Sequence, residues 1–437
     1  MGPMRICVVG IGKIGLPIAL QAASTGHQVI GADINLDLVN TVMSGNEPFP
    51  GEAHLLKHLS DALEAGLFTA TTVTADAVSQ SEAVIVAVPL VVDADLQPDF
   101  RALDAATAAI GSGLQPGTLV SYETTVPVGT TRGRFVPDLA ARSGLVAGQD
   151  FFVCFSPERV FSGRIFADLR KWPKIVGGID QESTDLATRL YESILKFDDR
   201  DDLDRPNGVW RVESAETAEM VKLAETTYRD INIALANEFS CYADRMGIRF
   251  ESVIQAANSQ PFSHIHRPGV AVGGHCIPVY PHLYAHGDSE ARMPLLSRSI
   301  NDAMPAYAVR RLQELVGDLG GRTVAVLGAA YRGGVKETAF SGVFPVVEEL
   351  TQRGANPKVH DPLYSDEELR VLGFEPFQLG MACEGMLLQA DHSDYQDLTI
   401  GDLPGVQGVV DGRGILDPAY WFDNSVAFAA LGRGDLT

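Results

Sequence analysis

Two stretches of the chain carry residues that could do chemistry together. One is the run Gly273-Gly274-His275-Cys276-Ile277-Pro278, and the other, near the amino terminus, is Gly10-Ile11-Gly12-Lys13-Ile14-Gly15. A thiolate can attack an aldehyde carbon, and hydride loss from the resulting adduct gives a thioester. The amino-terminal run fits G-x-G-x-x-G, a turn that holds a dinucleotide diphosphate at a helix N-terminus. The pair predicts hydride removal combined with covalent capture of a carbonyl.

The amino-terminal turn lies in a local pattern that supports this interpretation. Residues 5–33 have the pattern of a strand, a glycine turn, a helix and a second strand that ends at Asp33. A carboxylate at this distance could accept hydrogen bonds from an adenosine ribose and would repel a 2′-phosphate. A glycine turn without a ligand is the alternative, and the agreement of strand, helix and acid argues against it. The cofactor expected is therefore NAD rather than NADP.

The thiol loop needs more support, because each of its residues has a simpler explanation. A single cysteine such as Cys276 is usually an inert apolar residue. A single histidine such as His275 is more often structural than catalytic. A catalytic role for this loop therefore depends on the partners that the fold brings to it.

Periodicity predicts the elements that must position these residues. Buried-strand candidates at 83–88 and 117–121 alternate with stretches of helical period, which is typical of a parallel sheet covered by helices. A long helix is expected over 214–246, and 323–328 followed by 357–362 repeats the opening pattern. We predict an α/β fold with two Rossmann-like, doubly wound parallel-sheet domains joined by a long central helical dimerisation domain. The domains expected are 1–205 for NAD, 206–310 for dimerisation and the cysteine loop, and 311–437 for the nucleotide or sugar substrate.

Composition limits the class of protein. A length of 437 residues suits two or three domains, and no apolar run is long enough to span a bilayer. The five cysteines include no C-x-x-C pair, so we expect reduced thiols, no cysteine-rich zinc site and a cytoplasmic protein. The formal net charge of −22 would repel nucleic acid and anionic membranes, although acidity can also serve solubility alone. The partner expected is a small molecule.

Longer motifs identify a family. The runs Lys222-Leu223-Ala224-Glu225, Tyr228-Arg229-Asp230-Ile231-Asn232-Ile233-Ala234 and Asn237-Glu238 accompany the Cys276 loop in order. Supporting stretches lie at 123–131, 156–160 and 410–413. The chain resembles the UDP-glucose/GDP-mannose dehydrogenase family over essentially its whole length, nearest the UDP-N-acetylmannosamine and UDP-N-acetylglucosamine dehydrogenase branch.

The resemblance implies an enzyme that oxidises the primary alcohol of a nucleotide sugar twice, and a central helix that forms a dimer. Cys276 would be the nucleophile, Lys222 would stabilise the oxyanion, and Glu158 would serve as acid and base or orient water. An ammonium can stabilise a developing alkoxide and a carboxylate can relay its proton. Taken singly, Lys222 and Glu158 would more often be surface charges.

The same resemblance implies further contacts. The residues expected at the cofactor, besides the glycine turn and Asp33, are Val88, Pro89, Thr125 beside the nicotinamide, and Glu158. The residues expected at the substrate are Arg159, Val160, Lys222, Gly273, His275, Tyr331 and Arg332. No metal is expected.

Four positions depart from the family pattern. Thr226 replaces the asparagine four residues after the motif lysine, and Tyr280 replaces the aspartate four residues after the motif cysteine. In the C-terminal domain Arg332 replaces a lysine and Ala339 replaces an arginine, and arginine is not a neutral replacement for lysine. Loss of the asparagine and aspartate should impair acid formation more than hydride transfer, although the Thr226 and Tyr280 hydroxyls can also hydrogen-bond in the catalytic site.

Three functions remain open at this point. The first is an NAD-dependent oxidoreductase that oxidises a primary alcohol on the sugar of a nucleotide sugar or nucleoside through a cysteine-bound intermediate. The second is a redox-neutral NAD-dependent dehydratase or epimerase that oxidises a sugar hydroxyl transiently and needs no hydrolytic water. The third is a non-catalytic scaffold that binds a nucleotide sugar. The oligomeric state expected is a homodimer or a dimer-based oligomer.

Overall fold

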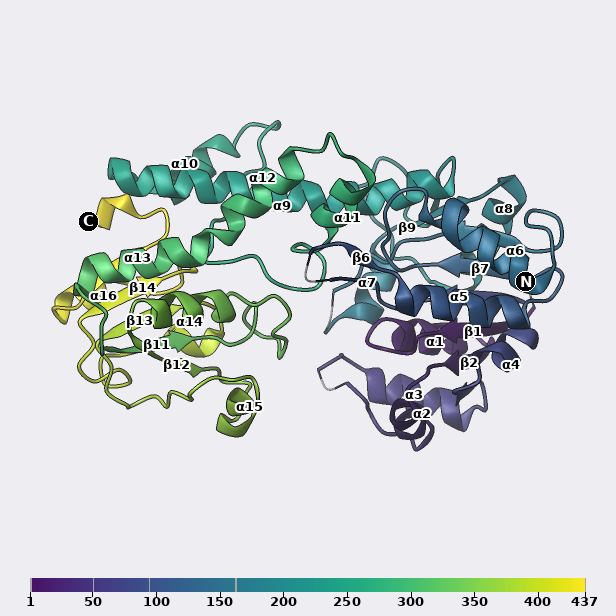
Figure 1. Ribbon diagram of the computed structural model, residues 1–437, viewed down its shortest axis with the longest axis horizontal. Coiled ribbons are helices and arrows are strands. Elements are labelled where there is room, and N and C mark those ends of the chain that lie inside the picture. The colour runs from purple at the N-terminus through teal and green to yellow at the C-terminus, as the bar shows by residue number, and fades with distance from the viewer. Residues whose placement is uncertain (1, 50, 94, 162, 437) are drawn as a thin grey trace. The chain divides into compact units, whose positions relative to one another are not determined.

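The computed structural model describes residues 2–49, 51–93, 95–161 and 163–436. The chain forms two compact units, Met1–Glu225 and Thr226–Thr437. Each unit contains its own sheet with helices on its faces (Figure 1), which confirms the predicted α/β class with two Rossmann-like domains. The division between the units falls inside the long helix α9 (Ala215–Met246), so the predicted domain boundaries at 205 and 310 stay predictions.

The first unit is built on an eight-stranded sheet with the order β10-β9-β8-β7-β4-β1-β2-β3. Its strands are β1 (Arg5–Val9), β2 (Gln28–Ala32), β3 (Phe68–Thr71), β4 (Ala83–Val86), β7 (Leu119–Tyr122), β8 (Phe152–Phe155), β9 (Lys174–Gly178) and β10 (Val209–Arg211). The strands from β3 to β8 along this order are parallel, as predicted. β9 runs antiparallel to β8, which the sequence did not indicate.

Helices cover both faces of this sheet because its central strands are apolar on both sides. The helices of the first unit are α1 (Gly15–Ser24), α2 (Leu36–Met43), α3 (Leu55–Glu64), α4 (Thr74–Ser79), α5 (Arg101–Gly113), α6 (Val136–Ser143), α7 (Ile165–Lys171) and α8 (Gln181–Ile194). Ile6, Val8 and Ile85 pack in one core with side chains of α1, α3, α7 and α8. On the opposite face the Tyr122 hydroxyl lies 2.9 Å from the Thr107 hydroxyl of α5. A π-helical turn, η1 (Thr131–Phe135), leads into α6, and β5 (Val91–Val92) pairs antiparallel with β6 (Pro98–Asp99).

The second unit has a five-stranded, fully parallel sheet with the order β12-β11-β13-β14-β15. Its strands are β11 (Thr323–Leu327), β12 (Asn356–His360), β13 (Gly385–Leu388), β14 (Gly408–Asp411) and β15 (Ala427–Ala430). Its helices after α9 are α10 (Phe250–Ala257), α11 (Tyr280–Gly287), α12 (Met293–Asp302), α13 (Met304–Val316), α14 (Val343–Gln352), α15 (Asp366–Val371) and α16 (Pro418–Asp423), with short 3-10 turns η2 (Ser393–Tyr395) and η3 (Gly434–Leu436). Val324 and Val326 face α13 and α14, and Ala325 and Leu327 face Tyr395 and Trp421, so alternate strand residues fill the two cores.

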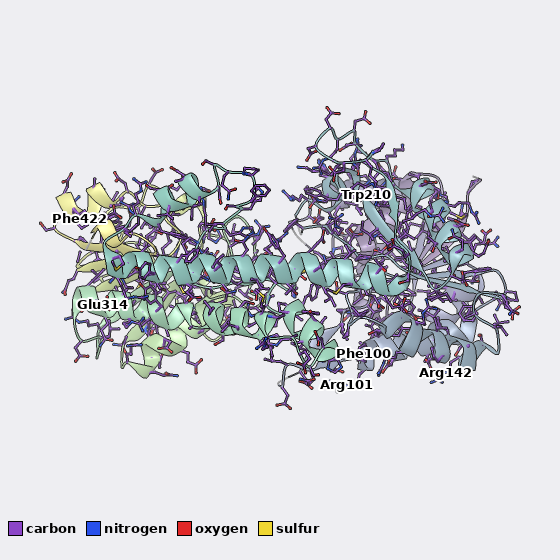
Figure 2. All side chains as sticks on the ribbon, turned by 90° about the horizontal axis from the view of Figure 1, so that it is seen from above. Phe100, Arg101, Arg142, Trp210, Glu314 and Phe422 are labelled. Atoms are coloured by element: carbon purple, nitrogen blue, oxygen red, sulfur yellow. The ribbon has the colours of Figure 1, made fainter. Side chains whose placement is uncertain are left out.

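Helix α9 runs unbroken from Ala215 to Met246 (Figure 2), close to the predicted 214–246. In the second unit a buried polar cluster joins it to α12. The Asp230 carboxylate accepts bonds from Arg298 Nη1 at 2.7 Å, Ser297 Oγ at 2.9 Å and Asn301 Nδ2 at 2.8 Å. Asn237 of α9 donates to Asn301 and accepts from the Gly269 N–H, so the same cluster holds the segment that leads to the cysteine loop. Among the described residues, no helix is both long and apolar enough to cross a membrane.

The Arg298→Met substitution should strongly destabilise the protein, because it leaves the fully buried Asp230 carboxylate without its cation. We expect the free energy of unfolding to fall by about 3–5 kcal/mol. Lys57→Ala is the control, since Lys57 and Asp61 form a pair exposed at 72% and 60%, and its loss should cost less than about 1 kcal/mol. Urea unfolding followed by circular dichroism measures both. Equal losses for the two variants would contradict the assigned role of the cluster.

Candidate functional site

Most of the predicted cofactor and catalytic residues of the first unit follow neighbouring strands at one edge of the sheet. The glycine turn follows β1, Val88 and Pro89 follow β4, Thr125 follows β7, and Glu158, Arg159 and Val160 follow β8. β8, β7, β4 and β1 are adjacent and parallel, so their carboxyl ends share an edge. Ligands of open α/β sheets bind at this edge. The strand order therefore brings these predicted residues together.

The glycine turn has the geometry of a diphosphate cradle. Gly10 has φ +86°, and a Cβ on Gly15 would lie 1.9 Å from the Gly10 carbonyl oxygen, so α1 packs directly on the end of β1. Nothing lies within 4 Å of the position of a Cβ on Gly12. This open space, in front of the N-terminus of α1, fits a diphosphate that approaches the backbone closely. Of the other turn residues, Ile11 is buried, Ile14 is half-buried and Lys13 is exposed.

Asp33 lies directly after β2, at the position predicted for ribose recognition. Its Oδ2 accepts the Ile11 N–H at 3.0 Å and its Oδ1 accepts the Asn35 N–H at 2.9 Å. The carboxylate is therefore fixed beside the glycine turn and remains half-exposed. The chain's own residues fit NAD at this site.

The loop that carries Thr125 is held from two sides. The Thr124 hydroxyl donates to the Val88 carbonyl oxygen at 2.6 Å, and Thr125 itself is buried. Further along the loop, the Glu219 carboxylate of α9 accepts the Gly129 N–H at 2.5 Å and the Thr131 N–H at 2.8 Å. Burial raises the pKa of the Glu219 carboxyl to about 7. Sequence reasoning missed Glu219, which ties this loop to the helix that carries Lys222.

The Lys222 side chain contacts the backbone of Glu158. The Lys222 ammonium donates to the Glu158 carbonyl oxygen at 2.6 Å. The Arg159 N–H donates to Glu158 Oε1 at 2.7 Å, and the Arg159 guanidinium pairs with Glu225. Val160 packs against the core of the first unit. Lys222 is thus aimed at the segment that follows β8.

Two further charged residues lie behind Glu158, and sequence reasoning missed both. Lys174 Nζ lies 2.8 Å from Glu158 Oε2 and 3.1 Å from Glu123 Oε1. The Lys174 and Glu123 side chains are only 5% and 1% exposed. Lys174 precedes an apolar run, where a lysine usually marks a solvent-exposed strand end, so its burial had no signal in the sequence.

In the second unit, the cysteine loop packs on the segment that follows β11. The Gly274 N–H donates to the Ala339 carbonyl oxygen at 2.8 Å, and a Cβ on Gly273 would lie 2.5 Å from the Tyr331 Cβ. His275 Nε2 lies 3.3 Å from Glu337 Oε2. Cys276 itself is half-buried. Three residues predicted at the substrate therefore lie together: Gly273 and His275 in the thiol loop, and Tyr331 packed against it.

Arg332 and Arg413 extend this surface. Arg332 Nε donates to the Tyr331 hydroxyl at 3.1 Å. Arg413 is half-buried, and it donates to the Gln389 carbonyl oxygen at 2.5 Å and to the Tyr331 carbonyl oxygen at 3.2 Å. Burial lowers the pKa of the Arg413 guanidinium. Arg413 belongs to a motif that supported the resemblance, although the sequence assigned it no role.

Two of the four departures from the family pattern, Tyr280 and Thr226, lie next to the Cys276 loop and in α9. Tyr280 is the first residue of α11, and its N–H donates to the Cys276 carbonyl oxygen at 2.9 Å. Thr226 is buried in α9, four residues after Lys222. Both side chains carry a hydroxyl where the family pattern has an amide or a carboxylate.

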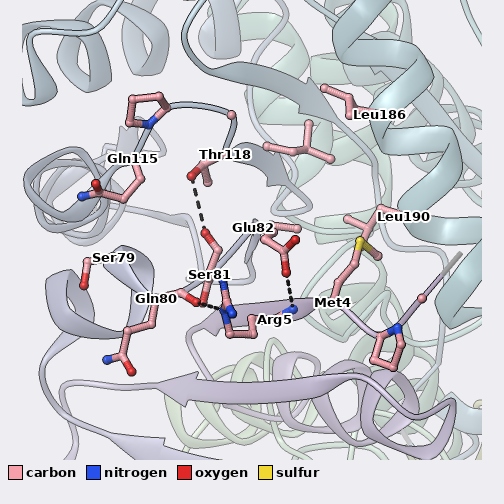
Figure 3. Close-up of a pocket in the computed structure, with 16 residues that line it drawn as sticks. Met4, Arg5, Ser79, Gln80, Ser81, Glu82, Gln115, Thr118, Leu186 and Leu190 are labelled. Atoms are coloured by element: carbon pink, nitrogen blue, oxygen red, sulfur yellow. Dashed lines mark hydrogen bonds between the residues drawn. The ribbon is translucent and has the colours of Figure 1, made fainter.

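A hollow of about 590 Å³ in the first unit lies away from this edge (Figure 3). It is lined by residues at the amino ends of β1, β4 and β7, among them Arg5, Glu82 and Thr118. Glu82 Oε2 accepts the Arg5 N–H at 3.0 Å, and Arg5 Nε donates to the Gln80 carbonyl oxygen at 2.6 Å. Because it lies at the opposite end of the strands from the glycine turn, it is not the cofactor site.

Sequence models of one family match along the chain. The UDP-glucose/GDP-mannose dehydrogenase family's NAD binding domain matches residues 4–195, its central domain 216–303 and its UDP binding domain 325–418. These matches confirm the resemblance predicted from the motifs.

Relatives are similar over nearly their full length. The UDP-N-acetyl-D-mannosamine dehydrogenase of Pyrococcus horikoshii is 33% identical over 99% of this chain and 100% of that protein. Its counterpart from Escherichia coli is 31% identical over 94% and 98%. Among solved structures, the P. horikoshii UDP-D-ManNAc dehydrogenase aligns with a TM-score of 0.87 at 31% identity, covering 99% of this chain and 100% of that one. A UDP-glucose dehydrogenase from Pyrobaculum islandicum aligns with a TM-score of 0.85 at 26% identity, covering 99% and 98%.

Two glycine substitutions should separate cofactor binding from folding. Gly12→Ala should leave the melting temperature unchanged and weaken NAD binding at least about tenfold, because its methyl group fits the empty turn but occupies the diphosphate space. Gly15→Ala should lower the melting temperature, since its methyl group meets the Gly10 carbonyl. Isothermal titration with NAD and thermal melting measure the two effects.

Gly133→Ala is the matched control for Gly12→Ala. Gly133 also has open space around its Cβ position and an ordinary φ, but lies in η1. It should bind NAD as the unmodified chain does. Wild-type NAD affinity in Gly12→Ala would contradict the assignment of the turn.

Proposed function

The chain belongs to the UDP-glucose/GDP-mannose dehydrogenase family and is an NAD-dependent nucleotide-sugar dehydrogenase, and from this premise we propose that it oxidises a sugar's primary alcohol to the carboxylate through Cys276. The observation that carries the proposal is the convergence of the glycine turn, Thr125, Glu158 and Lys222 at one sheet edge. The relatives that act on UDP-N-acetyl-D-mannosamine lead us to propose a UDP-N-acetylhexosamine as the substrate class.

Each residue has a role that its chemistry allows. Bound NAD would accept the hydride in each of the two oxidations. Glu158 would take the proton of the alcohol, and the Lys222 ammonium would stabilise the negative charge that develops on the oxygen. The Cys276 thiolate would bond to the carbonyl carbon, so that the second oxidation yields a thioester that water cleaves. The overall change adds one oxygen and removes two hydrogens from the sugar.

Within each unit, the residues predicted at the substrate have proposed roles of their own. Arg332 and His275 would supply positive charge or hydrogen bonds to the nucleotide diphosphate, and Tyr331 would pack beside it against Gly273. Arg159 and Val160 would border the sugar. We assign Thr226 and Tyr280 the hydrogen bonds to the oxyanion and water that the replaced amide and carboxylate would make.

The mass of the product tests this function. The purified protein is incubated with NAD and a panel of UDP-hexoses and UDP-N-acetylhexosamines, and the product is identified by mass spectrometry. Gain of one oxygen with loss of two hydrogens supports the dehydrogenase. Loss of water, or a product of unchanged mass that chromatography separates from the substrate, would favour the dehydratase or epimerase, which the known relatives do not favour. Absence of turnover on every sugar would favour a scaffold.

Cys276→Ser should abolish acid formation. A hydroxyl is a far weaker nucleophile than a thiolate at neutral pH, so we expect the rate of acid formation to fall at least about 100-fold. Cys241→Ser is the control, because Cys241 is also half-buried but lies in α9 beside Met304. Acid formation is followed by mass spectrometry at saturating NAD. An unchanged rate in Cys276→Ser would rule out the covalent route.

A second copy of the chain is the proposed partner of α9. One side of this helix carries exposed apolar residues at helical spacing, namely Tyr228, Leu235, Phe239, Tyr242 and Met246. A continuous apolar stripe of this kind is typical of a helix that packs against another helix. The family resemblance implies a dimer through this central helix, which supports a homodimer.

Charges placed on the stripe should separate the subunits. For Leu235→Asp with Tyr242→Asp we expect the mass in light scattering to fall from twice 46.9 kDa to 46.9 kDa. Val371→Asp is the control, since Val371 is 80% exposed and lies on α15. A monomeric unmodified chain, or a double variant that stays dimeric, would contradict the proposal.

We propose the cytoplasm as the compartment. All five cysteines are free thiols in the structure, and such thiols suit a reducing environment.

A further inference from the structure

The strongest unexplained feature is the buried charge cluster behind Glu158. Lys174 Nζ lies between two carboxylates, 2.8 Å from Glu158 Oε2 and 3.1 Å from Glu123 Oε1. The Tyr191 hydroxyl donates to Glu123 Oε1 at 2.5 Å, and the Ser121 hydroxyl lies 2.7 Å from the Tyr191 oxygen. Of these groups only Glu158, at 11% exposed, reaches the surface of the unit.

The fold dictates this arrangement. Ser121 and Glu123 are two residues apart at the end of β7, so their side chains point to the same face, where Tyr191 of α8 lies. Lys174 opens β9, the strand that runs antiparallel to β8, and Glu158 follows β8. The antiparallel strand therefore brings the ammonium beside the carboxyl ends of β7 and β8.

Burying one ammonium and two carboxylates carries a large desolvation cost. Structural stability alone needs one carboxylate per ammonium. The second one leaves a net negative charge whenever both carboxyls are ionised. Moreover, Glu123 Oε2 is buried and has no hydrogen-bond partner among the described residues, so a proton there would displace no donor.

We propose that Glu123 and Lys174 are positioning residues for Glu158: Lys174 fixes its carboxylate, and the charge on Glu123 sets how strong a base it is. When Glu123 is ionised, the Lys174 ammonium is shared between two carboxylates. When Glu123 is neutral, the full charge of Lys174 falls on Glu158, and this carboxylate then draws the proton of the alcohol less strongly. The inference rests on the proposed role of Glu158 as the acid and base.

The electrostatics of the cluster support this. Burial raises the pKa of the Glu123 carboxyl to about 7, against the opposing effect of the Lys174 charge. Burial lowers the pKa of Lys174, but the two carboxylates raise it more, so Lys174 stays protonated. The other titratable groups that face Glu123 are Glu158, Tyr191 and Cys154, and burial raises the pKa of the latter two. Glu123 is thus the group of this cluster whose charge changes near neutral pH.

The Glu123→Gln variant tests the proposal, because glutamine keeps the size of the side chain and fixes it in the neutral state. The measurement is the single-turnover rate of the first NADH formed, between pH 6 and pH 9. At about pH 8.5 the variant should be about 10-fold slower than the unmodified enzyme, and below about pH 6 the two rates should converge. KM for the sugar and Kd for NAD should change less than about twofold. A rate lowered equally at every pH would indicate a merely structural role and overturn the proposal.

Substitutions at Lys174 provide the rescue test. Lys174→Met should lower the same rate about 100-fold, whereas Lys174→Arg, which keeps the charge, should recover most of it and retain the pH-dependent step. If Lys174→Met does not fold, Glu123→Gln and Lys174→Arg still give the pH profiles that decide the proposal. Equal single-turnover rates in Lys174→Arg and Lys174→Met would overturn the proposal.

Tyr122→Phe is the matched control. Tyr122 is fully buried next to Glu123 on β7, but its hydroxyl bonds to Thr107 on the opposite face of the sheet. It should lower the melting temperature and leave the pH profile unchanged. If the unmodified enzyme is active, and Glu123→Gln and Lys174→Met have the same rates as it at every pH, this inference alone is overturned. An unmodified enzyme that oxidises no nucleotide sugar would contradict the proposed function and the inference with it.

Discussion

The burial of the Lys174 ammonium is the constraint on which the candidate site residues of the first unit depend. A charge that is 5% exposed is tolerated only if carboxylates and a fixed backbone surround it. Glu158 is consequently held after β8, and Lys222 of α9 donates to the carbonyl oxygen of that same residue. The part of α9 that belongs to the first unit therefore contacts the segment that the buried charge fixes.

Close backbone packing fixes the other side of the same edge. The contact between Gly15 and the Gly10 carbonyl brings the N-terminus of α1 to the end of β1, and the Thr124 bond to the Val88 carbonyl oxygen connects the next two loops. Glu219 then connects the Thr125 loop to α9. The glycine turn, the Thr125 loop and Glu158 are thus positioned by one continuous set of contacts within one sheet edge.

Local patterns were sufficient to predict the fold class, the glycine turn between β1 and α1 with Asp33 after β2, and α9 to within a residue of its start, because glycine spacing and helical period are local signals. The predicted 83–88 strand ends earlier, at Val86. The antiparallel β9 and the buried roles of Glu123, Lys174 and Glu219 could not be predicted. Their partners are distant in sequence, and a charged residue beside an apolar run gives the same pattern whether it is exposed or buried. The roles of Cys276, Thr226 and Tyr280 stay proposals that rest on family motifs.

The central claim is that this chain carries out two successive oxidations on one sugar despite Thr226 and Tyr280. The number of NADH molecules formed for each sugar consumed tests it most directly, with absorbance at 340 nm for NADH and chromatography for the sugar. Two NADH for each sugar is the result that the account predicts. One would mean that oxidation stops at the aldehyde, and none would mean a redox-neutral reaction, and either result would contradict the account.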